Sequence, residues 1–140
     1  MDVHKRRLLA LLLLLLALMS LCLLFGWEKV EIRADIRILQ EDTNAAADTA
    51  ELLIRGKQRL FSNGHFRGEI SITPDHDSAY AFSCDIVSGA YEENDDYWSL
   101  SFGYIDSGSP GVLTLFCKKN LHELSISGNL YPRVTAAVLS

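Results

Sequence analysis

The segment that most constrains this chain is residues 8–25, which begin with Leu8 and end with Phe25. It contains no charged side chain, and 12 of its 18 residues are Leu. Each Leu near the centre of a spanning helix favours membrane insertion by roughly 0.5 kcal/mol, so the leucines together contribute about 6 kcal/mol. Extended to Trp27, the segment forms a helix about 30 Å long, which matches the hydrocarbon layer. We therefore expect residues 8–27 to contact the lipid bilayer as a transmembrane anchor, with Trp27 at the interface.

The charges before this segment predict its orientation. His4, Lys5, Arg6 and Arg7 precede the apolar run, and basic residues remain on the cytoplasmic side. Residues 1–7 are then a cytoplasmic leader, and the C-terminal region is extracytoplasmic. The expected localisation is a single-pass membrane protein.

Signal cleavage is the alternative, and the exported region would then be secreted. Cleavage requires small residues at positions minus one and minus three. Gly26 could occupy the first of these positions, but Leu24 would occupy the second. Lipidation at Cys22 is opposed by Leu21, which stands where a small residue is needed. An uncleaved signal anchor is therefore favoured.

The exported part, residues 28–140, has room for one modest domain. It contains 10 Lys and Arg against 17 Asp and Glu, which gives a formal charge of 10 − 17 = −7. Such a charge repels phosphate backbones. This argues against nucleic acid as a partner, and also against a basic surface that recognises lipid.

Residues 28–64 combine two patterns. In the first part, apolar Val30, Ile32, Ala34, Ile36 and Ile38 alternate with charged residues, which favours a half-buried strand. Some of the same residues also fit a helical stripe, so a juxtamembrane helix stays open.

After a polar break, apolar residues recur at helical spacing and predict an amphipathic helix. Gly56 weakens this helix, and Asn63 and Gly64 are typical of its end. The apolar residues that carry the pattern are Ala46, Ala50, Leu53, Ile54, Leu60 and Phe61.

Residues 65–140 show short alternating runs separated by turn residues, which is typical of an antiparallel sheet. The clearest run has Trp98, Leu100, Phe102 and Tyr104 on one face. Residues 106–111 are rich in Gly, Ser and Pro and predict a hairpin loop. Other inward rows are predicted at Phe66, Ile70 and Ile72; at Tyr80, Phe82, Cys84 and Ile86; at Leu113, Leu115 and Cys117; and at Leu124 and Ile126. Residues 131–140 receive no assignment.

A sheet with one apolar face needs a second layer to cover it. The predicted amphipathic helix is the only candidate in the sequence. The predicted fold class is therefore α+β: an N-terminal transmembrane signal-anchor helix, followed by a small antiparallel sheet of about five strands with one helix packed on it.

Cys84 and Cys117 could form a disulfide, because each lies on the inward parity of its strand. An extracytoplasmic location permits the bond, and closing a loop of about 34 residues would stabilise the fold by roughly 3 to 4 kcal/mol. The alternative is that both are small buried side chains that never meet.

Residues 88–96 are predicted to form an acidic loop that could bind a small molecule or a glycan. Aromatic side chains beside polar loops recur at binding surfaces. The candidate residues are Tyr91, Glu92, Glu93, Asp95, Asp96 and Tyr97. The calcium-loop template begun at Asp75 fails, because Tyr80 and Ile86 stand where it requires Gly and Glu. No metal site is predicted.

The sequence contains no recognisable catalytic motif. The exported histidines, His65, His76 and His122, lie in or beside predicted turns, and the residues around Ser109 lack the first glycine of a nucleophile elbow. Phosphate loops and zinc spacings are also missing. We therefore expect a protein that is not an enzyme and has no cofactor.

Three functions remain open at this point. The favoured one is an interaction or structural role at the cell envelope, with an envelope protein as partner. The second is a secreted or tethered module that binds a small ligand or glycan. The third is a pilin-like subunit, in which the apolar helix continues into an amphipathic one; the lack of Gly and Pro between Trp27 and Arg55 favours this geometry.

Overall fold

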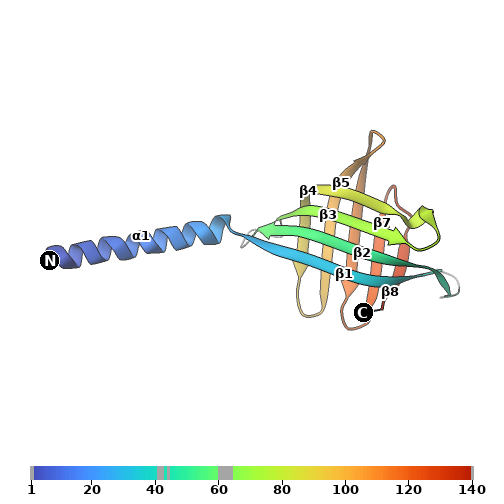
Figure 1. The fold of residues 1–140 in the computed structure, drawn as a ribbon, viewed down its shortest axis with the longest axis horizontal. Helices are drawn as coiled ribbons and strands as arrows, with labels where there is room; N and C mark the ends of the chain where they lie inside the picture. Colours follow the sequence, from blue (N-terminus) through green and yellow to red (C-terminus); the bar gives the residue numbers. More distant parts are fainter. Residues whose placement is uncertain (1, 41–42, 44, 60–64, 140) are drawn as a thin grey trace.

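The structure is a computed structural model that describes residues 2–40, 43, 45–59 and 65–139. It begins with one long helix, α1 (Val3–Phe25), which projects away from a β-domain formed by the rest of the chain (Figure 1). None of the most apolar window of α1 is buried. By length and composition, α1 is the one described helix that could cross a membrane.

In the described residues, eight strands follow α1, and they are arranged in chain order. They are β1 (Trp27–Leu39), β2 (Ala46–Arg59), β3 (His65–Pro74), β4 (Phe82–Glu93), β5 (Tyr97–Asp106), β6 (Ser109–Lys118), β7 (Glu123–Gly128) and β8 (Val134–Val138). A short 3₁₀ helix, η1 (Ser78–Tyr80), lies between β3 and β4.

The strands form a closed antiparallel barrel. Each strand pairs with the next, and β8 returns to pair with β1, where Ile36 lies opposite Val138 and Leu39 opposite Thr135. The predicted α+β fold, with about five strands and one helix packed on them, is therefore wrong. The apolar face of the sheet needs no helix to cover it, because the sheet closes on itself and encloses that face.

The predicted amphipathic helix is strand β2. Its inward row is Asp48, Ala50, Leu52 and Ile54, which has the period of a strand, and Ile54 pairs with Ile32 of β1. Local alanine-rich composition favours a helix, but pairing on both edges overrides that preference. The strand predicted for residues 30–38 is confirmed as part of β1. Leu60 and Phe61, which were expected in the apolar stripe of the helix, and Asn63 and Gly64, which were expected to end it, lie outside the described residues.

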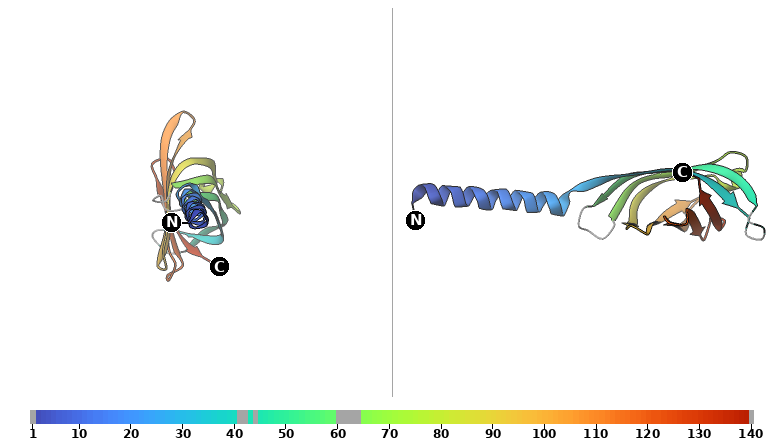
Figure 2. Two further views of the ribbon diagram at one scale, coloured as in Figure 1. Left: turned by 90° about the vertical axis from the view of Figure 1, so that its left-hand side faces the viewer. Right: turned by 90° about the horizontal axis from the view of Figure 1, so that it is seen from below.

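Two groups of strands cross each other to enclose the core. The long strands β1–β4 run in the direction of α1, and β5–β8 cross behind them (Figures 1 and 2). Strand β4 belongs to both groups: residues 82–90 pair with β3, and residues 89–93 pair with β5. Crossed packing of this kind requires strands that bend at the corners.

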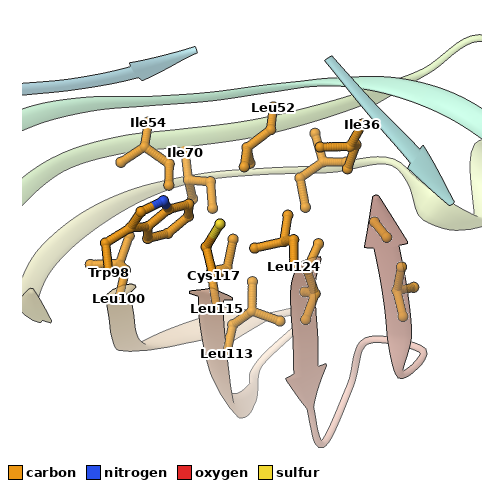
Figure 3. Close-up of a cluster of buried hydrophobic side chains, with 14 of the residues drawn as sticks. Ile36, Leu52, Ile54, Ile70, Trp98, Leu100, Leu113, Leu115, Cys117 and Leu124 are labelled. Atoms are coloured by element: carbon orange, nitrogen blue, oxygen red, sulfur yellow. The ribbon is translucent and has the colours of Figure 1, made fainter. Parts of the chain in front are cut away.

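Apolar side chains from both groups fill the space inside the barrel. Figure 3 shows Ile36, Leu52, Ile54 and Ile70 from β1–β3 facing Trp98, Leu100, Leu113, Leu115, Cys117 and Leu124 from β5–β7. Most of these side chains are less than 2% exposed. The interior is a packed core, as in other small eight-stranded barrels.

The outer face of the long strands is charged. In β1 the exposed residues Glu31, Arg33, Asp35 and Arg37 alternate with buried or partly buried apolar ones. Polar side chains outside and apolar ones inside suit a barrel that is surrounded by water.

Several predictions for residues 65–139 are confirmed. The run from Trp98 to Tyr104 is β5, and the hairpin expected near residues 106–111 joins β5 to β6. Its turn is only two residues long, with positive φ at Ser107 (50°) and Gly108 (83°), as in type I′ hairpins. Strand β8, which closes the barrel, was not predicted.

Strands β2 and β3 approach each other closely at a pair of glycines. Gly56 lies directly opposite Gly68. A Cβ atom at Gly56 would come within 2.2 Å of the carbonyl oxygen of Arg67 and 2.7 Å of the Phe66 ring. Gly56, which the helical interpretation treated as a weak point, is a position where only glycine fits.

Candidate functional site

The predicted loop of residues 88–96 is mostly strand. Strand β4 continues to Glu93, and only residues 94–96 form the connection to β5, so the predicted loop bounds are wrong. Tyr91 is buried, and Asp95 and Asp96 are exposed in the turn. In this part of β4, Ser88, Ala90 and Glu92 are exposed and alternate with the buried Gly89 and Tyr91. The run of acids at residues 92–96 obscures this alternation in the sequence.

Two of the predicted loop residues, Tyr91 and Glu93, bind each other. The Tyr91 hydroxyl donates to Oε2 of Glu93 at 2.7 Å, and Lys119 Nζ lies 2.8 Å from Oε1 of the same carboxylate. The Lys119 ammonium, together with the Tyr91 hydroxyl, lowers the pKa of Glu93. Burial, followed by the hydrogen bond to Glu93, raises the pKa of Tyr91. This cluster joins the β4–β5 turn to the end of β6.

The turn itself is fixed by hydrogen bonds. The side-chain oxygen of Asn94 accepts from the backbone N–H groups of Asp96 (2.8 Å) and Tyr97 (2.9 Å). The Tyr97 hydroxyl donates to Oε1 of Glu92 at 2.8 Å, and the Lys119 N–H donates to the carbonyl of Asp96. Both phenols and two of the four acids are thus occupied by partners within the protein.

Cys84 and Cys117 are free thiols in the structure. Cys117 lies opposite Trp98 at one end of β5, whereas Cys84 pairs with Ile70 in the half of β4 that belongs to the other group of strands. The two thiols are not bonded to each other in the structure. Burial raises the pKa of both thiols, which keeps them in the less reactive protonated form.

Residue Asp48 forms a buried polar cluster that sequence analysis missed. Its side chain is fully buried, on the inward row of β2. One carboxylate oxygen accepts from the backbone N–H groups of His76 (3.1 Å) and Asp77 (2.7 Å), and the other accepts from the Thr49 N–H (2.8 Å). The imidazole Nδ1 of His76 also lies 3.0 Å from Asp48 Oδ1.

Other contacts secure the same loop to β2. The Asp75 N–H donates to the Thr49 carbonyl at 2.8 Å, and the Thr49 hydroxyl donates to the Asp75 carboxylate. Asp77 in turn accepts from the Ala79 N–H and caps η1. The β3–β4 connection is therefore bound to β2 by one buried carboxylate and its neighbours.

Hydrogen bonding determines the charge state of this cluster. The Asp77 N–H and the other donors hold the pKa of Asp48 well below its ordinary value, although burial acts in the opposite direction. The hydrogen bond to Asp48 and the negative charges of Asp48 and Asp75 raise the pKa of His76. Near neutral pH Asp48 is ionised, and its negative charge extends the pH range over which His76 stays protonated.

A shallow surface hollow of about 560 Å³ lies beside His76. Its wall comes from the end of β3, from η1 and from the start of β4. The lining residues are Ser71, Ile72, Thr73, Pro74, His76, Ser78, Ala81, Phe82 and Ser83. An imidazole oriented by a buried carboxylate can act in acid–base chemistry. In the residues that the structure describes, however, no hydroxyl or thiol group is hydrogen-bonded to this imidazole.

Replacing His76 by Ala should destabilise the protein more at pH 5.5 than at pH 8.5. The native pKa of His76 lies above the unfolded value, so its contribution is complete below about 6.5 and is lost as the pH rises through the native pKa. Chemical unfolding of the full chain in detergent at both pH values measures this. His122→Asn, in an exposed turn with positive φ, is the control. An equal loss of stability at both pH values would contradict the charge-based role.

The other two histidines of the barrel are separate from this cluster. His65 begins β3 and His122 lies in the turn before β7, and both are exposed. Over the described residues, no three His, Cys, Asp or Glu side chains lie close enough to hold a metal ion together.

Comparisons with known proteins returned no match: no protein-family model matches the chain, and neither does a curated protein or a solved structure.

Proposed function

We propose that this chain is a single-pass membrane protein that displays a rigid β-barrel outside the cytoplasm and binds an envelope partner through the outer surface of that barrel. The observation that carries the proposal is the position of α1. The helix has an uncharged run as long as a bilayer is thick, and the barrel buries none of its most apolar window. Water is a poor solvent for such a surface, and lipid is a good one.

The orientation follows from the leader. His4, Lys5, Arg6 and Arg7 form the first turns of α1 and supply the positive charge that stays in the cytoplasm. Trp27 then begins β1 on the opposite side. This arrangement supports an extracytoplasmic barrel.

The packed interior supports binding on the outside. A barrel that carries a small molecule needs an internal cavity, whereas the side chains of Phe66, Leu100 and Leu115 occupy the interior of this one and are almost completely buried. The suggested glycan loop is also less available, because Tyr91 and Tyr97 are bonded to neighbouring carboxylates. A protein partner on the barrel surface is the better proposal.

The pilin-like alternative loses its structural basis. It requires an apolar helix that continues into an amphipathic one. Here α1 ends at Phe25, and the chain enters β1 at Trp27. The described residues contain no helical continuation.

Replacing Leu12 and Leu16 by Arg should release the full-length chain from membranes during a carbonate wash. Each Arg at the centre of a spanning helix costs about 2.5 to 3.5 kcal/mol, so the pair costs about 5 to 7 kcal/mol and offsets the roughly 6 kcal/mol that the leucines contribute. The double replacement by Val is the matched control and should remain bound. Extraction of membranes followed by immunoblotting provides the measurement.

The orientation needs a second measurement on the wild type. Externally added protease should remove a C-terminal tag from cells whose cytoplasmic membrane is intact and exposed. Full-length wild type that washes off the membranes, or a tag cut only after lysis, would contradict the proposal. A shortened form released into the medium would instead support secretion.

A further inference from the structure

Three cations lie side by side on the outer face of the barrel. Lys29 of β1 is directly opposite Lys57 of β2, and Lys57 is directly opposite Arg67 of β3. All three side chains are exposed. Like charges in such positions repel each other, so the row is unfavourable for the isolated fold. Within the described part of the chain, none of the three lies within ion-pair distance of an acid.

In the next outward row, acids and a cation alternate from β1 to β3. There Glu31 is opposite Arg55, and Arg55 is opposite Glu69, with 3.5 Å between Arg55 Nε and Glu69 Oε1. Glu69 is in turn opposite Asp85 of β4. Glu31, Glu69 and Asp85 thus belong to this second row, which lies farther from α1. Glu28, the exposed acid next to Lys29, accepts a hydrogen bond from the Gln58 side chain at 3.1 Å.

The basic row is at the end of the barrel that adjoins α1. Only Gly26 separates α1 from Trp27, and Lys29 follows two residues later, about 7 Å along the strand. The Arg67 guanidinium lies 5.9 Å from the centre of the Trp27 ring. Figure 1 shows that the start of β1 and the adjacent end of β2 are the parts of the barrel closest to α1. With Trp27 at the interface, the row falls at the depth of the lipid headgroups.

A surface hollow of about 740 Å³ adjoins the row. Lys57 and Arg67 line it together with apolar side chains from β1 and β4, among them Trp27 and Val87, which is 74% exposed. The Gly56–Gly68 pair forms part of its wall. Cationic groups beside apolar ones match an anionic headgroup attached to an acyl chain.

We propose that the headgroup surface, defined as Lys29, Lys57 and Arg67 with the hollow beside Trp27, binds anionic lipids of the bilayer that α1 enters. The proposal rests on the membrane anchoring proposed above. The net charge of −7 for residues 28–140 does not oppose it, because screening limits charge effects to about 10 Å. The sequence argument against a basic lipid-recognising surface rests on the average charge of residues 28–140, whereas the headgroup surface is a local arrangement of three cations.

Native mass spectrometry of the full chain, in neutral detergent micelles doped equally with phosphatidylglycerol and phosphatidylcholine, tests this. The wild type should retain the anionic lipid at least about threefold over the zwitterionic one, because each nearby cation favours anionic surfaces. Neutralising the row by Lys29→Gln, Lys57→Gln and Arg67→Gln should remove the preference. Neutralising Arg37, Lys118 and Arg133 to Gln changes the net charge equally at positions outside the headgroup surface and should leave the preference intact.

Two further measurements separate the outcomes. Salt at 0.5 M should abolish the preference of the wild type, which keeps the test valid if the triple variant does not fold. Added inorganic phosphate should compete only weakly; complete displacement of phosphatidylglycerol by millimolar phosphate would indicate a site for free anions and overturn the proposal. If the wild type resists carbonate extraction but retains both lipids equally, the headgroup surface is overturned and the membrane anchor is not. Release of the wild type by carbonate would instead overturn the anchor.

Discussion

Replacing Gly56 by Ala will lower the free energy of unfolding by about 3 kcal/mol or more. The added methyl group would lie 2.2 Å from the carbonyl oxygen of Arg67 and 2.8 Å from the Cα of Gly68. Both atoms belong to the backbone of β3, so the strands would have to separate. Overpacking in a well-filled region commonly costs 1 to 3 kcal/mol, and a backbone clash is at the upper end. Chemical unfolding of the full chain in detergent, followed by circular dichroism, measures the loss.

Gly103→Ala is the matched control. A Cβ atom at Gly103 would have its nearest neighbour at 3.7 Å, which is an ordinary contact, and the residue is exposed on β5. This substitution should change stability by less than about 1 kcal/mol, since it restricts the unfolded chain without a clash. If both substitutions had the same effect, the close approach of β2 and β3 could not be correct.

Replacing Asp48 by Ala will lower the midpoint of thermal unfolding at pH 7 by roughly 10 °C or more. The substitution removes a buried acceptor and leaves the N–H groups of Thr49, His76 and Asp77 without their partner. Unsatisfied donors are costly, and hydrogen bonds to a charged group are among the stronger ones. Asp95→Ala, in the exposed β4–β5 turn, is the control and should have little effect.

The cost of Asp48→Ala should also depend on pH. Because the native pKa of Asp48 lies far below the unfolded value of about 3.8, its contribution is complete above that value and declines as the pH falls through the native pKa. The difference between wild type and variant should therefore be largest near pH 7 and smaller at pH 2. Thermal unfolding at the two pH values measures it. A difference that grew toward acid pH would contradict an ionised native carboxylate.

Sequence patterns predicted the strands whose two faces differ clearly. Trp98, Leu100 and Phe102 alternate with small polar residues, and the alternation identified β5 correctly. Strand β2 was assigned wrongly because its inward row begins with Asp48 and its outward row contains Leu53, so the period of two is obscured. Only pairing with β1 and β3 shows which face is buried, and pairing is a property of the whole sheet.

Closure of the barrel was beyond sequence reasoning for a related reason. Strand β8 is short and follows Tyr131 and Pro132 without a marked pattern, and its pairing with Ile36 depends on the curvature of all the intervening strands. The polar sites could not be predicted from the sequence for the same reason. Asp48 meets His76 across 28 positions of sequence, and Lys29 meets Lys57 across 28 positions. Such contacts follow from register, which composition and spacing do not specify.

The junction at Gly26 also determines how far the protein can reach. Only one residue separates α1 from β1, so no flexible linker lets the barrel move away from the helix. Along β2, from Arg59 to Asp48, the chain advances roughly 35 Å. If α1 is inserted as proposed, the turn that carries His76 is held at a nearly constant height above the bilayer. Another protein in the same membrane would contact that turn only if its extracytoplasmic part extended about as far from the bilayer. A protein with a shorter extracytoplasmic part would contact only the end of the barrel that adjoins α1.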